Sequence, residues 1–183
     1  CSIAYHLAKA GERDVLLLEK SRLTHGATWH AAGLVGQLRS TSNLTRMMNY
    51  SATLFAEIGA ETGQDVGWRA VGSLRLASSP ERWEELKRAA TTARALDFEL
   101  HLIGPEEAKR LYPVAALDGV VGAAFIPKDG YVDPYGLTQA YARGARSGGA
   151  MIVEEVAVTG IERRGDRILG VRTTRGAVAC EIL

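Results

Sequence analysis

The first nineteen residues constrain the fold more than any other part of the sequence. The segment Ser2–Ala10 carries its apolar residues at helical spacing, and Gly11 follows as a C-terminal stop. After a short turn, Val15–Glu19 is a continuous apolar run that ends on an acid. Such runs are typical of strands buried on both faces of a parallel sheet. A helix, a glycine turn and a buried strand in this order predict the second half of a βαβ unit, and therefore an α/β fold.

The acid at the end of this strand, Glu19, is a candidate binding residue. In dinucleotide-binding βαβ units, an acid at this place hydrogen-bonds a ribose hydroxyl. The glycine fingerprint of such units lies about 20 residues before the acid, which is upstream of Cys1. We therefore expect the sequence to be part of a longer chain. Spacing alone leaves two alternatives open: Glu19 as a solvated residue closing a strand, and either NAD or FAD as the dinucleotide.

Composition argues against several other classes of protein. Of the 183 residues, 46% are hydrophobic, which is enough for the core of one domain or of two small interleaved ones. The 22 basic and 21 acidic residues give a net charge of +1, so we expect a small-molecule partner and neither a nucleic acid nor a membrane. The two cysteines, Cys1 and Cys180, lie at opposite ends, which predicts no metal site and a reducing compartment.

The stretch after the acid, Lys20–Ser40, is dense in small residues and reads KSRLTHGATWHAAGLVGQLRS. It shows neither strand alternation nor a helical stripe before Ala31. Small residues let backbone amides approach a cofactor, and the hydroxyl of Thr28 suits a phosphate oxygen or a helix cap. Within this stretch, THGATWHAAGL (Thr24–Leu34) closely resembles the flavin loop of the dimethylglycine and sarcosine dehydrogenase family, FAD enzymes with a D-amino acid oxidase-like fold. The resemblance continues through ETGQDVGWRAVGSLRLASSPERWEELK and covers nearly the whole chain.

The resemblance implies FAD as cofactor and assigns residues to it. The ribose region would contact Glu19 and Lys20, the pyrophosphate and isoalloxazine would lie against Gly26–Leu34, and the backbone of Val158 would reach the adenine. His30 would carry the flavin covalently through its 8α-methyl carbon, a role that suits an imidazole that is largely neutral near pH 7. The implied cofactor-binding residues are Glu19, Lys20, Gly26, Ala27, Thr28, Trp29, His30, Ala31, Ala32, Gly33, Leu34 and Val158.

Each of these assignments has a structural alternative. A lone histidine such as His30 is often satisfied by a backbone carbonyl, Trp29 beside a cofactor loop is more often a packing residue, and Val158 could be an ordinary buried strand valine. Four arginines could bind a substrate carboxylate as a planar fork but receive no assignment: Arg39, Arg46, Arg69 and Arg75. No catalytic residue is identified in the sequence, and His6, His25 and His101 lack any motif.

The remaining periodicities predict a mixed α/β chain. Helices are expected at residues 43–62, 80–96, 105–112 and from 134 to about 145. Residues 66–78 read as two short antiparallel strands or one bent strand, and residues 99–103 as a short strand. From Met151 onward, alternating residues with turns near 164–166 and 175–176 predict a β-meander. The fold is thus expected to be a truncated FAD-binding Rossmann-type domain with an inserted substrate-side α+β subdomain. Its segments would be an FAD-binding part at 1–41, the substrate-side part at 42–128 and a return to the FAD-binding domain at 129–183.

The resemblance also implies an activity. The full-length protein would oxidise an N-methylated glycine derivative, dimethylglycine or sarcosine, by hydride transfer to flavin N5, and the iminium product would be hydrolysed or passed to tetrahydrofolate. Electron-transfer flavoprotein or oxygen would reoxidise the flavin, in the bacterial cytoplasm or the mitochondrial matrix. Two alternatives stay open: an amine or amino-acid oxidase of the same fold, and a non-catalytic module that binds no FAD by itself.

Overall fold

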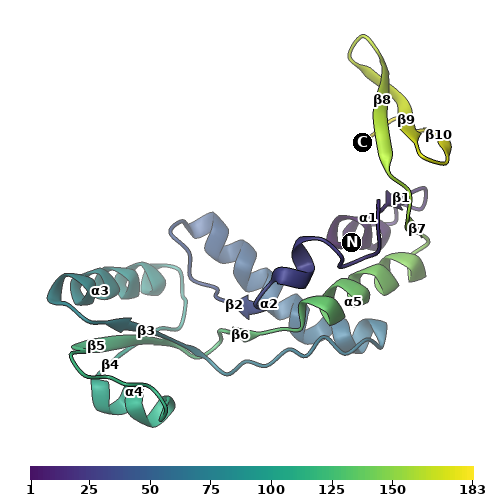
Figure 1. The fold of residues 1–183 in the computed structure, drawn as a ribbon. Helices are drawn as coiled ribbons and strands as arrows, with labels where there is room; N and C mark the ends of the chain where they lie inside the picture. Colours follow the sequence, from purple (N-terminus) through teal and green to yellow (C-terminus); the bar gives the residue numbers. More distant parts are fainter. The chain divides into compact units, whose positions relative to one another are not determined.

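A computed structural model describes residues 1–183 (Figure 1). The helices are α1 (Ser2–Lys9), the 3-10 helix η1 (Ala27–His30), α2 (Ser42–Thr62), α3 (Pro80–Ala95), α4 (Pro105–Leu111) and α5 (Pro134–Ser147). The strands are β1 (Leu16–Leu18), β2 (Leu34–Val35), β3 (Ser73–Ala77), β4 (His101–Ile103), β5 (Gly122–Ile126), β6 (Gly130–Tyr131), β7 (Met151–Val153), β8 (Val158–Arg164), β9 (Arg167–Thr173) and β10 (Gly176–Ala179). The chain is therefore mixed α/β, with every predicted helix present.

The chain divides into two compact units, each built from separate stretches of sequence. The first comprises Cys1–Ala32, Glu57–Val66 and Asp133–Leu183, and the second comprises Gly33–Ala56 and Gly67–Val132. Each unit has its own buried residues and its own sheets. None of the helices is long and apolar enough to span a bilayer.

A parallel strand pair and two helices form the centre of the first unit. Strands β1 and β7 pair in parallel, with Leu17 opposite Ile152. Helices α1 and α5 pack against each other, and the ring of Tyr5 on α1 is buried against Tyr141 on α5. Gly144 makes this approach possible, because a Cβ at that position would lie 2.7 Å from the Tyr5 ring. The predicted helix and strand at the start of the chain are thus confirmed, and the strand has a parallel partner. The expected burial of the strand on both faces is not observed, because Leu16 is exposed and Leu17 and Leu18 are only partly buried.

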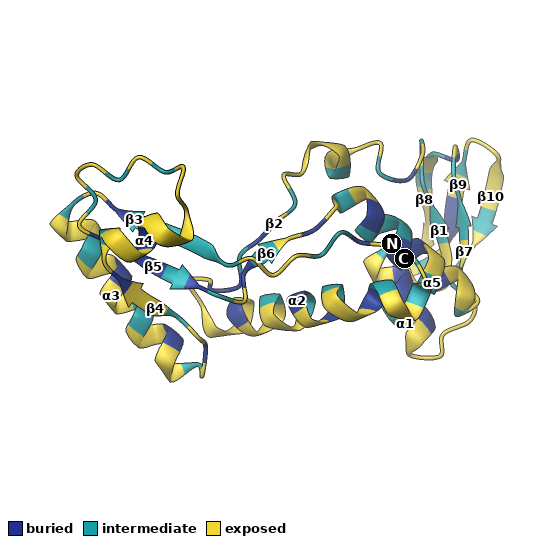
Figure 2. Cartoon of the chain, turned by 90° about the horizontal axis from the view of Figure 1, so that it is seen from below, coloured by how far each residue is buried: buried dark blue, intermediate teal, exposed yellow.

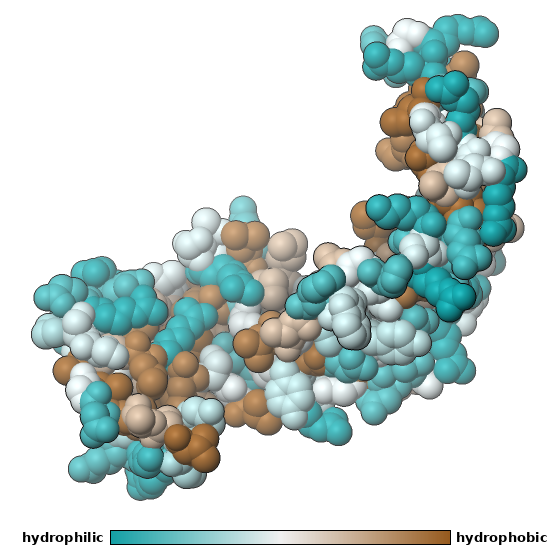
Figure 3. Space-filling model, in the orientation of Figure 1, coloured by the Kyte–Doolittle hydropathy of each residue, from teal (hydrophilic) through white to brown (hydrophobic).

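The end of the chain forms the predicted β-meander, with strand order β10-β9-β8. The first turn lies between β8 and β9, where Gly165 has a φ of 59°, a value that favours glycine. Figure 3 shows the far end of the meander as hydrophilic, in keeping with the arginines that flank this turn. The predicted turns at residues 164–166 and 175–176 are therefore confirmed.

The second unit contains an antiparallel sheet of order β3-β5-β4. Helix α3 packs on this sheet through Leu86, and α4 packs on it through Ala108. Ser79 caps α3 as predicted, since its hydroxyl accepts a hydrogen bond from the backbone N–H of Arg82 at 3.2 Å. The core of this unit therefore lies between the central strand and the two helices.

Two parts of this unit differ from the sequence-based prediction. The alternation at residues 66–78 left open two short antiparallel strands or one bent strand. The structure has a single shorter strand there, Ser73–Ala77, which pairs with β5, and Gly72 turns the chain at a φ of 81° just before it. No element was predicted for residues 114–128, yet β5 is the central strand there. Its sequence GAAFI has a low strand propensity, and burial between β3 and β4 stabilises it instead.

A buried carboxylate connects several segments of the second unit. Asp129, which is 1% exposed, accepts a hydrogen bond from the backbone N–H of Gln37 at 2.8 Å and one from the Ser73 hydroxyl at 2.6 Å. The Gln37 side chain, also 1% exposed, donates to the carbonyl of Lys128. These bonds hold the chain that follows β2 against the start of β3 and the loop before β6.

Candidate functional site

The candidate ribose ligand, Glu19, directly follows β1. Its backbone N–H donates to the carbonyl of Val153 at 2.9 Å, and its own carbonyl accepts from Val156 at 3.0 Å. One carboxylate oxygen accepts from the N–H of Ser21 at 2.8 Å, and the side chain is partly exposed. The backbone of Glu19 is thus fixed by the β7 segment, while its carboxylate stays accessible.

The start of α1 lies close to the same carboxylate. The first residue, Cys1, lies within electrostatic range of the Glu19 carboxylate. Cys1 is the N-cap residue of α1. In dinucleotide-binding units, the acid that ends such a strand lies beside a ribose hydroxyl. Contact of Glu19 with a dinucleotide stays a prediction.

The loop that follows is held at its base and exposed beyond it. Leu23 is buried, and its N–H donates to the Glu154 carboxylate at 2.6 Å. Thr24 adopts a positive φ of 75°, and its carbonyl accepts from the N–H of Trp29 at 3.2 Å. Figure 2 shows most of the loop between β1 and β2 as exposed. The base positions the loop, and its outer part remains available for binding.

His30 ends η1 and is exposed. Its Nδ1 lies 3.3 Å from the carbonyl oxygen of Gly26. The structural alternative, a histidine hydrogen-bonded to a backbone carbonyl, therefore applies to Nδ1. A carbonyl can only accept, so the bond places a proton on Nδ1, and in the neutral imidazole the lone pair is then on Nε2. The Trp29 ring lies beside it, with centroids 6.3 Å apart and planes at 80°. The structure thus leaves Nε2 of His30 accessible and without a hydrogen bond to the chain.

Gly26 shows that the loop has room for a bound group. A Cβ added at this residue would meet no atom within 4 Å. Packing within the chain therefore does not require a glycine here. A cofactor that approaches the backbone would require it, because a side chain would stand between the amides and the ligand. The small residues of the loop fit a cofactor lying over it.

The predicted cofactor-binding residues fall into both compact units. Those in the first unit are Glu19, Lys20, Gly26, Ala27, Thr28, Trp29, His30, Ala31, Ala32 and Val158, and those in the second are Gly33 and Leu34. Most are exposed, and only Glu19, Thr28 and Gly33 are partly buried. Val158 is 47% exposed at the start of β8, so it is not the ordinary buried strand valine that was the alternative. Their contact with FAD stays a prediction.

Sequence reasoning missed a hollow beside the loop. It has a volume of about 510 Å³ and lies between residues 22–29, one face of α5 and the end of β7. The side chains around it are Arg22, Leu23, Thr24, His25, Trp29, Tyr135, Gln139, Arg146 and Glu154. These residues come from three separate segments that no sequence motif connects, so the hollow could not be predicted from the sequence.

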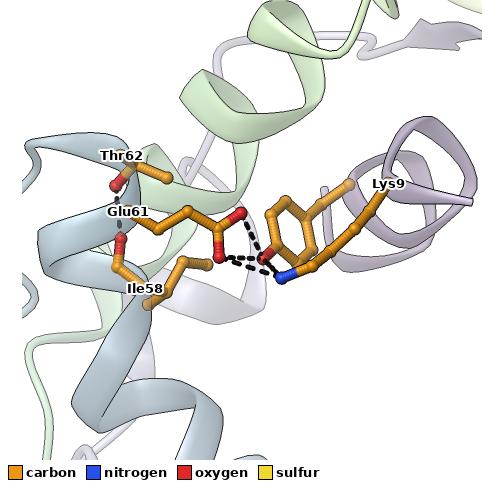
Figure 4. Close-up of polar contacts among 5 residues, drawn as sticks. Lys9, Ile58, Glu61 and Thr62 are labelled. Carbon is orange, nitrogen blue, oxygen red and sulfur yellow. Dashed lines mark hydrogen bonds and ion pairs between the residues drawn. The ribbon is translucent and has the colours of Figure 1, made fainter.

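Sequence reasoning also missed a polar cluster that joins α1 to the end of α2. The Tyr5 hydroxyl donates to both oxygens of Glu61 at 2.8 Å, and the Lys9 ammonium donates to that hydroxyl at 2.8 Å and to Glu61 at 2.9 Å (Figure 4). Burial raises the pKa of Tyr5, and the hydrogen bonds from Lys9 and Tyr5 lower the pKa of Glu61. The cluster links α1 to the end of α2 through the hydrogen bonds that Tyr5 and Lys9 donate to Glu61.

The chain was compared with known families, proteins and structures. The family model described as "FAD dependent oxidoreductase" matches residues 1–183. Mitochondrial dimethylglycine dehydrogenase of Rattus norvegicus is 44% identical over 177 residues, which is 97% of this chain and 21% of that protein. Mitochondrial sarcosine dehydrogenase of Homo sapiens is 38% identical over 184 residues, 97% of this chain and 20% of that protein. The chain thus spans about a fifth of the length of these relatives.

Among solved structures, L-proline dehydrogenase from P. horikoshii matches with a TM-score of 0.93. It is 30% identical in sequence, and the match covers 99% of this chain and 48% of that one. The arrangement of helices and strands described above is therefore one that occurs in a solved amino-acid dehydrogenase.

Proposed function

Since the chain belongs to the FAD dependent oxidoreductase family, we propose that it is the part of an amine dehydrogenase that holds the adenosine side and the flavin loop of FAD. The substrate would be an N-methylated glycine derivative, dimethylglycine or sarcosine. The likeness to dimethylglycine dehydrogenase, which extends over 97% of the chain, carries this proposal. The accessible imidazole of His30 and the open surface above Gly26 support it.

Different residues of the chain would contact different parts of the cofactor. The carboxylate of Glu19 would accept a hydrogen bond from a ribose hydroxyl, because it directly follows β1 and is partly exposed. Lys20 is exposed next to it and would contribute a positive charge to the same region. The loop from Gly26 to Leu34 would lie against the pyrophosphate and isoalloxazine, and Val158 would approach the adenine through its backbone.

His30 would anchor the cofactor covalently through Nε2. The bond from Nδ1–H to the carbonyl of Gly26 selects the tautomer in which Nε2 carries the lone pair, and exposure leaves that nitrogen accessible. A bound FAD would supply the hydride acceptor for oxidation of the substrate C–H bond. Fixing it at His30 would keep the acceptor at one place relative to the loop, which lowers the entropic part of the barrier.

The full-length protein, loaded with FAD and free of oxygen, provides the test. We expect dimethylglycine or sarcosine to bleach the flavin absorbance in a single turnover, whereas L-proline and glycine should not do so at the same concentration. Formaldehyde release, measured with and without tetrahydrofolate, would show whether the iminium product is hydrolysed or passed on. Bleaching by L-proline alone would replace this substrate class, and oxygen uptake during turnover would identify the protein as an oxidase.

A further inference from the structure

The hollow beside the flavin loop has an unusual set of side chains around its opening. Trp29 is 76% exposed and Tyr135 is 57% exposed. Arg22 and Arg146 line the same hollow. Large aromatic residues together with arginine are the residues enriched at the centres of protein–protein interfaces. Small-molecule sites, in contrast, enclose most of their ligand, and aromatic rings this exposed would leave a small ligand largely in water.

The charges around the hollow are not balanced within the chain. Arg146 forms no ion pair, and Arg22 reaches only Glu155, at 3.7 Å, with both side chains mostly exposed. The one acid that lines the hollow, Glu154, accepts a hydrogen bond from the N–H of Leu23 and pairs with neither arginine within 4.0 Å. Among the residues that line the hollow, the two guanidinium groups of Arg22 and Arg146 thus outnumber the single carboxylate of Glu154, which is hydrogen-bonded to Leu23. A partner with an acidic surface would complement this excess of positive charge.

The position of Trp29 connects this surface with the proposed cofactor site. Trp29 and His30 are consecutive residues of the 3-10 helix η1, so their side chains point about 120° apart. Trp29 lines the hollow, whereas His30 does not. Helix α5, which carries Tyr135 and Arg146, packs against η1. The exposed tryptophan therefore lies one residue from the proposed flavin anchor and faces a different direction.

We propose that this hollow and its rim are the docking surface for the acidic face of an electron-accepting protein. The inference rests on the proposed function. Oxidation of the amine to an iminium removes two electrons and one proton from the substrate. The two electrons pass to the docked protein, which is thereby reduced, and the proton passes to solvent. Trp29 and Tyr135 supply the contact area, and Arg22 and Arg146 orient the partner by charge.

The test uses the FAD-loaded full-length protein with two acceptors: electron-transfer flavoprotein from the same source, and the dye phenazine methosulfate. In the double variant Arg22→Glu, Arg146→Glu, we expect kcat/KM for the protein acceptor to fall about ten-fold or more at low ionic strength, because charge steering speeds association by that order. The dye-linked rate should stay unchanged. The control variant Arg163→Glu, Arg164→Glu reverses two exposed charges on β8, away from the hollow, and should retain both rates.

Four results would overturn the docking proposal. They are an unchanged rate with the protein acceptor, an equal loss in the control variant, turnover with oxygen as the only acceptor, and competitive inhibition by citrate at fixed ionic strength. The last would identify a small-anion site. Oxidation of the amine is judged separately, by bleaching of the flavin in one turnover without any acceptor. Of the four results, only turnover with oxygen would also change the proposed function, from a dehydrogenase to an oxidase. FAD content and unfolding midpoint, measured for each variant, exclude misfolding as the cause.

Discussion

Two adjacent stretches of the chain differ sharply in how their side chains are used. In the loop Gly26–Ala32, all residues except Thr28 are exposed, and the only side-chain hydrogen bond is that of His30. In Val35–Leu38, three of the four residues are buried, and Gln37 bonds to Asp129 and Lys128. The exposed small residues of the loop are thus followed, a few residues later in the sequence, by buried residues with polar partners.

The difference indicates which residues serve binding and which serve stability. Buried side chains with satisfied partners contribute to the free energy of folding, and an exposed loop contributes little to it. Substitutions in the loop should therefore change cofactor binding with little effect on stability, and substitutions in the buried stretch should do the reverse.

The largest loss of stability is expected for Asp129→Ala. The substitution deprives the N–H of Gln37 and the hydroxyl of Ser73 of their acceptor. At about 1–3 kcal/mol for each unsatisfied group, the free energy of unfolding should fall by roughly 2–6 kcal/mol. Denaturant unfolding of the full-length protein measures this. Asp129→Asn, which keeps one acceptor oxygen, should lose less, and a loss below about 0.5 kcal/mol for Asp129→Ala would contradict the role assigned to this carboxylate.

A matched pair of truncations compares the two stretches directly. Val35 is 5% exposed and Trp29 is 76% exposed. We expect Val35→Ala to lower the free energy of unfolding by about 1–3 kcal/mol, because it removes buried methyl groups. Trp29→Ala removes a much larger side chain, yet it should change stability by no more than about 0.5 kcal/mol. Equal losses in the two variants, measured by the same unfolding experiment, would show that the loop is packed like its neighbour.

The cluster of Tyr5, Lys9 and Glu61 is intermediate in exposure, and it should show the smallest effect. The pKa of Glu61 is lowered below its usual 4.5, so its contribution is present above pH 4.5 and is lost as the pH falls through the lowered value. The pKa of Tyr5 is raised, so its contribution is present below pH 10 and is lost as the pH rises through the raised value.

Glu61→Gln should therefore cost at most about 1 kcal/mol near neutral pH, since the side chains of Lys9 and Glu61 are 53% and 42% exposed. The difference from wild type should disappear in acid, below the lowered pKa of Glu61. Unfolding midpoints of both proteins across the pH range measure it. A difference that persists unchanged in acid would mean that the cluster acts by packing and not by charge.

Local signals predicted the helices and turns well. Ser79 with Pro80 marked the start of α3, and Asp133 with Pro134 marked the start of α5, because capping depends on residues adjacent in sequence. The lack of periodicity in residues 20–30 likewise predicted an irregular loop, whereas its role in flavin binding was implied by the family resemblance alone. These features could be predicted because their physical causes lie within a few residues.

Features that depend on distant partners could not be predicted. Strand β5 is rich in glycine and alanine, and it forms because neighbours on both sides pair with it. Asp129 bonds to residues 92 and 56 positions away in sequence. The hollow beside Trp29 assembles from three segments. In each case, the residue pattern of one segment does not indicate which distant segments pair with it or pack against it.

The central claim is that His30 holds FAD covalently, and acid denaturation of the full-length protein followed by gel electrophoresis tests it most directly. We expect yellow fluorescence to migrate with the wild-type polypeptide and to vanish from His30→Ala. The matched control is His25→Ala, which removes another exposed histidine of the same loop, one whose Nδ1 lies 2.7 Å from the Ser21 hydroxyl oxygen. This control should keep its fluorescence.

The opposite results are equally clear. Release of all flavin from the denatured wild-type protein, or fluorescence retained on His30→Ala, would contradict the anchor. Covalent fluorescence that depends on His30 and not on His25 would confirm that the exposed loop binds the cofactor, as its contrast with the buried stretch beside it predicts.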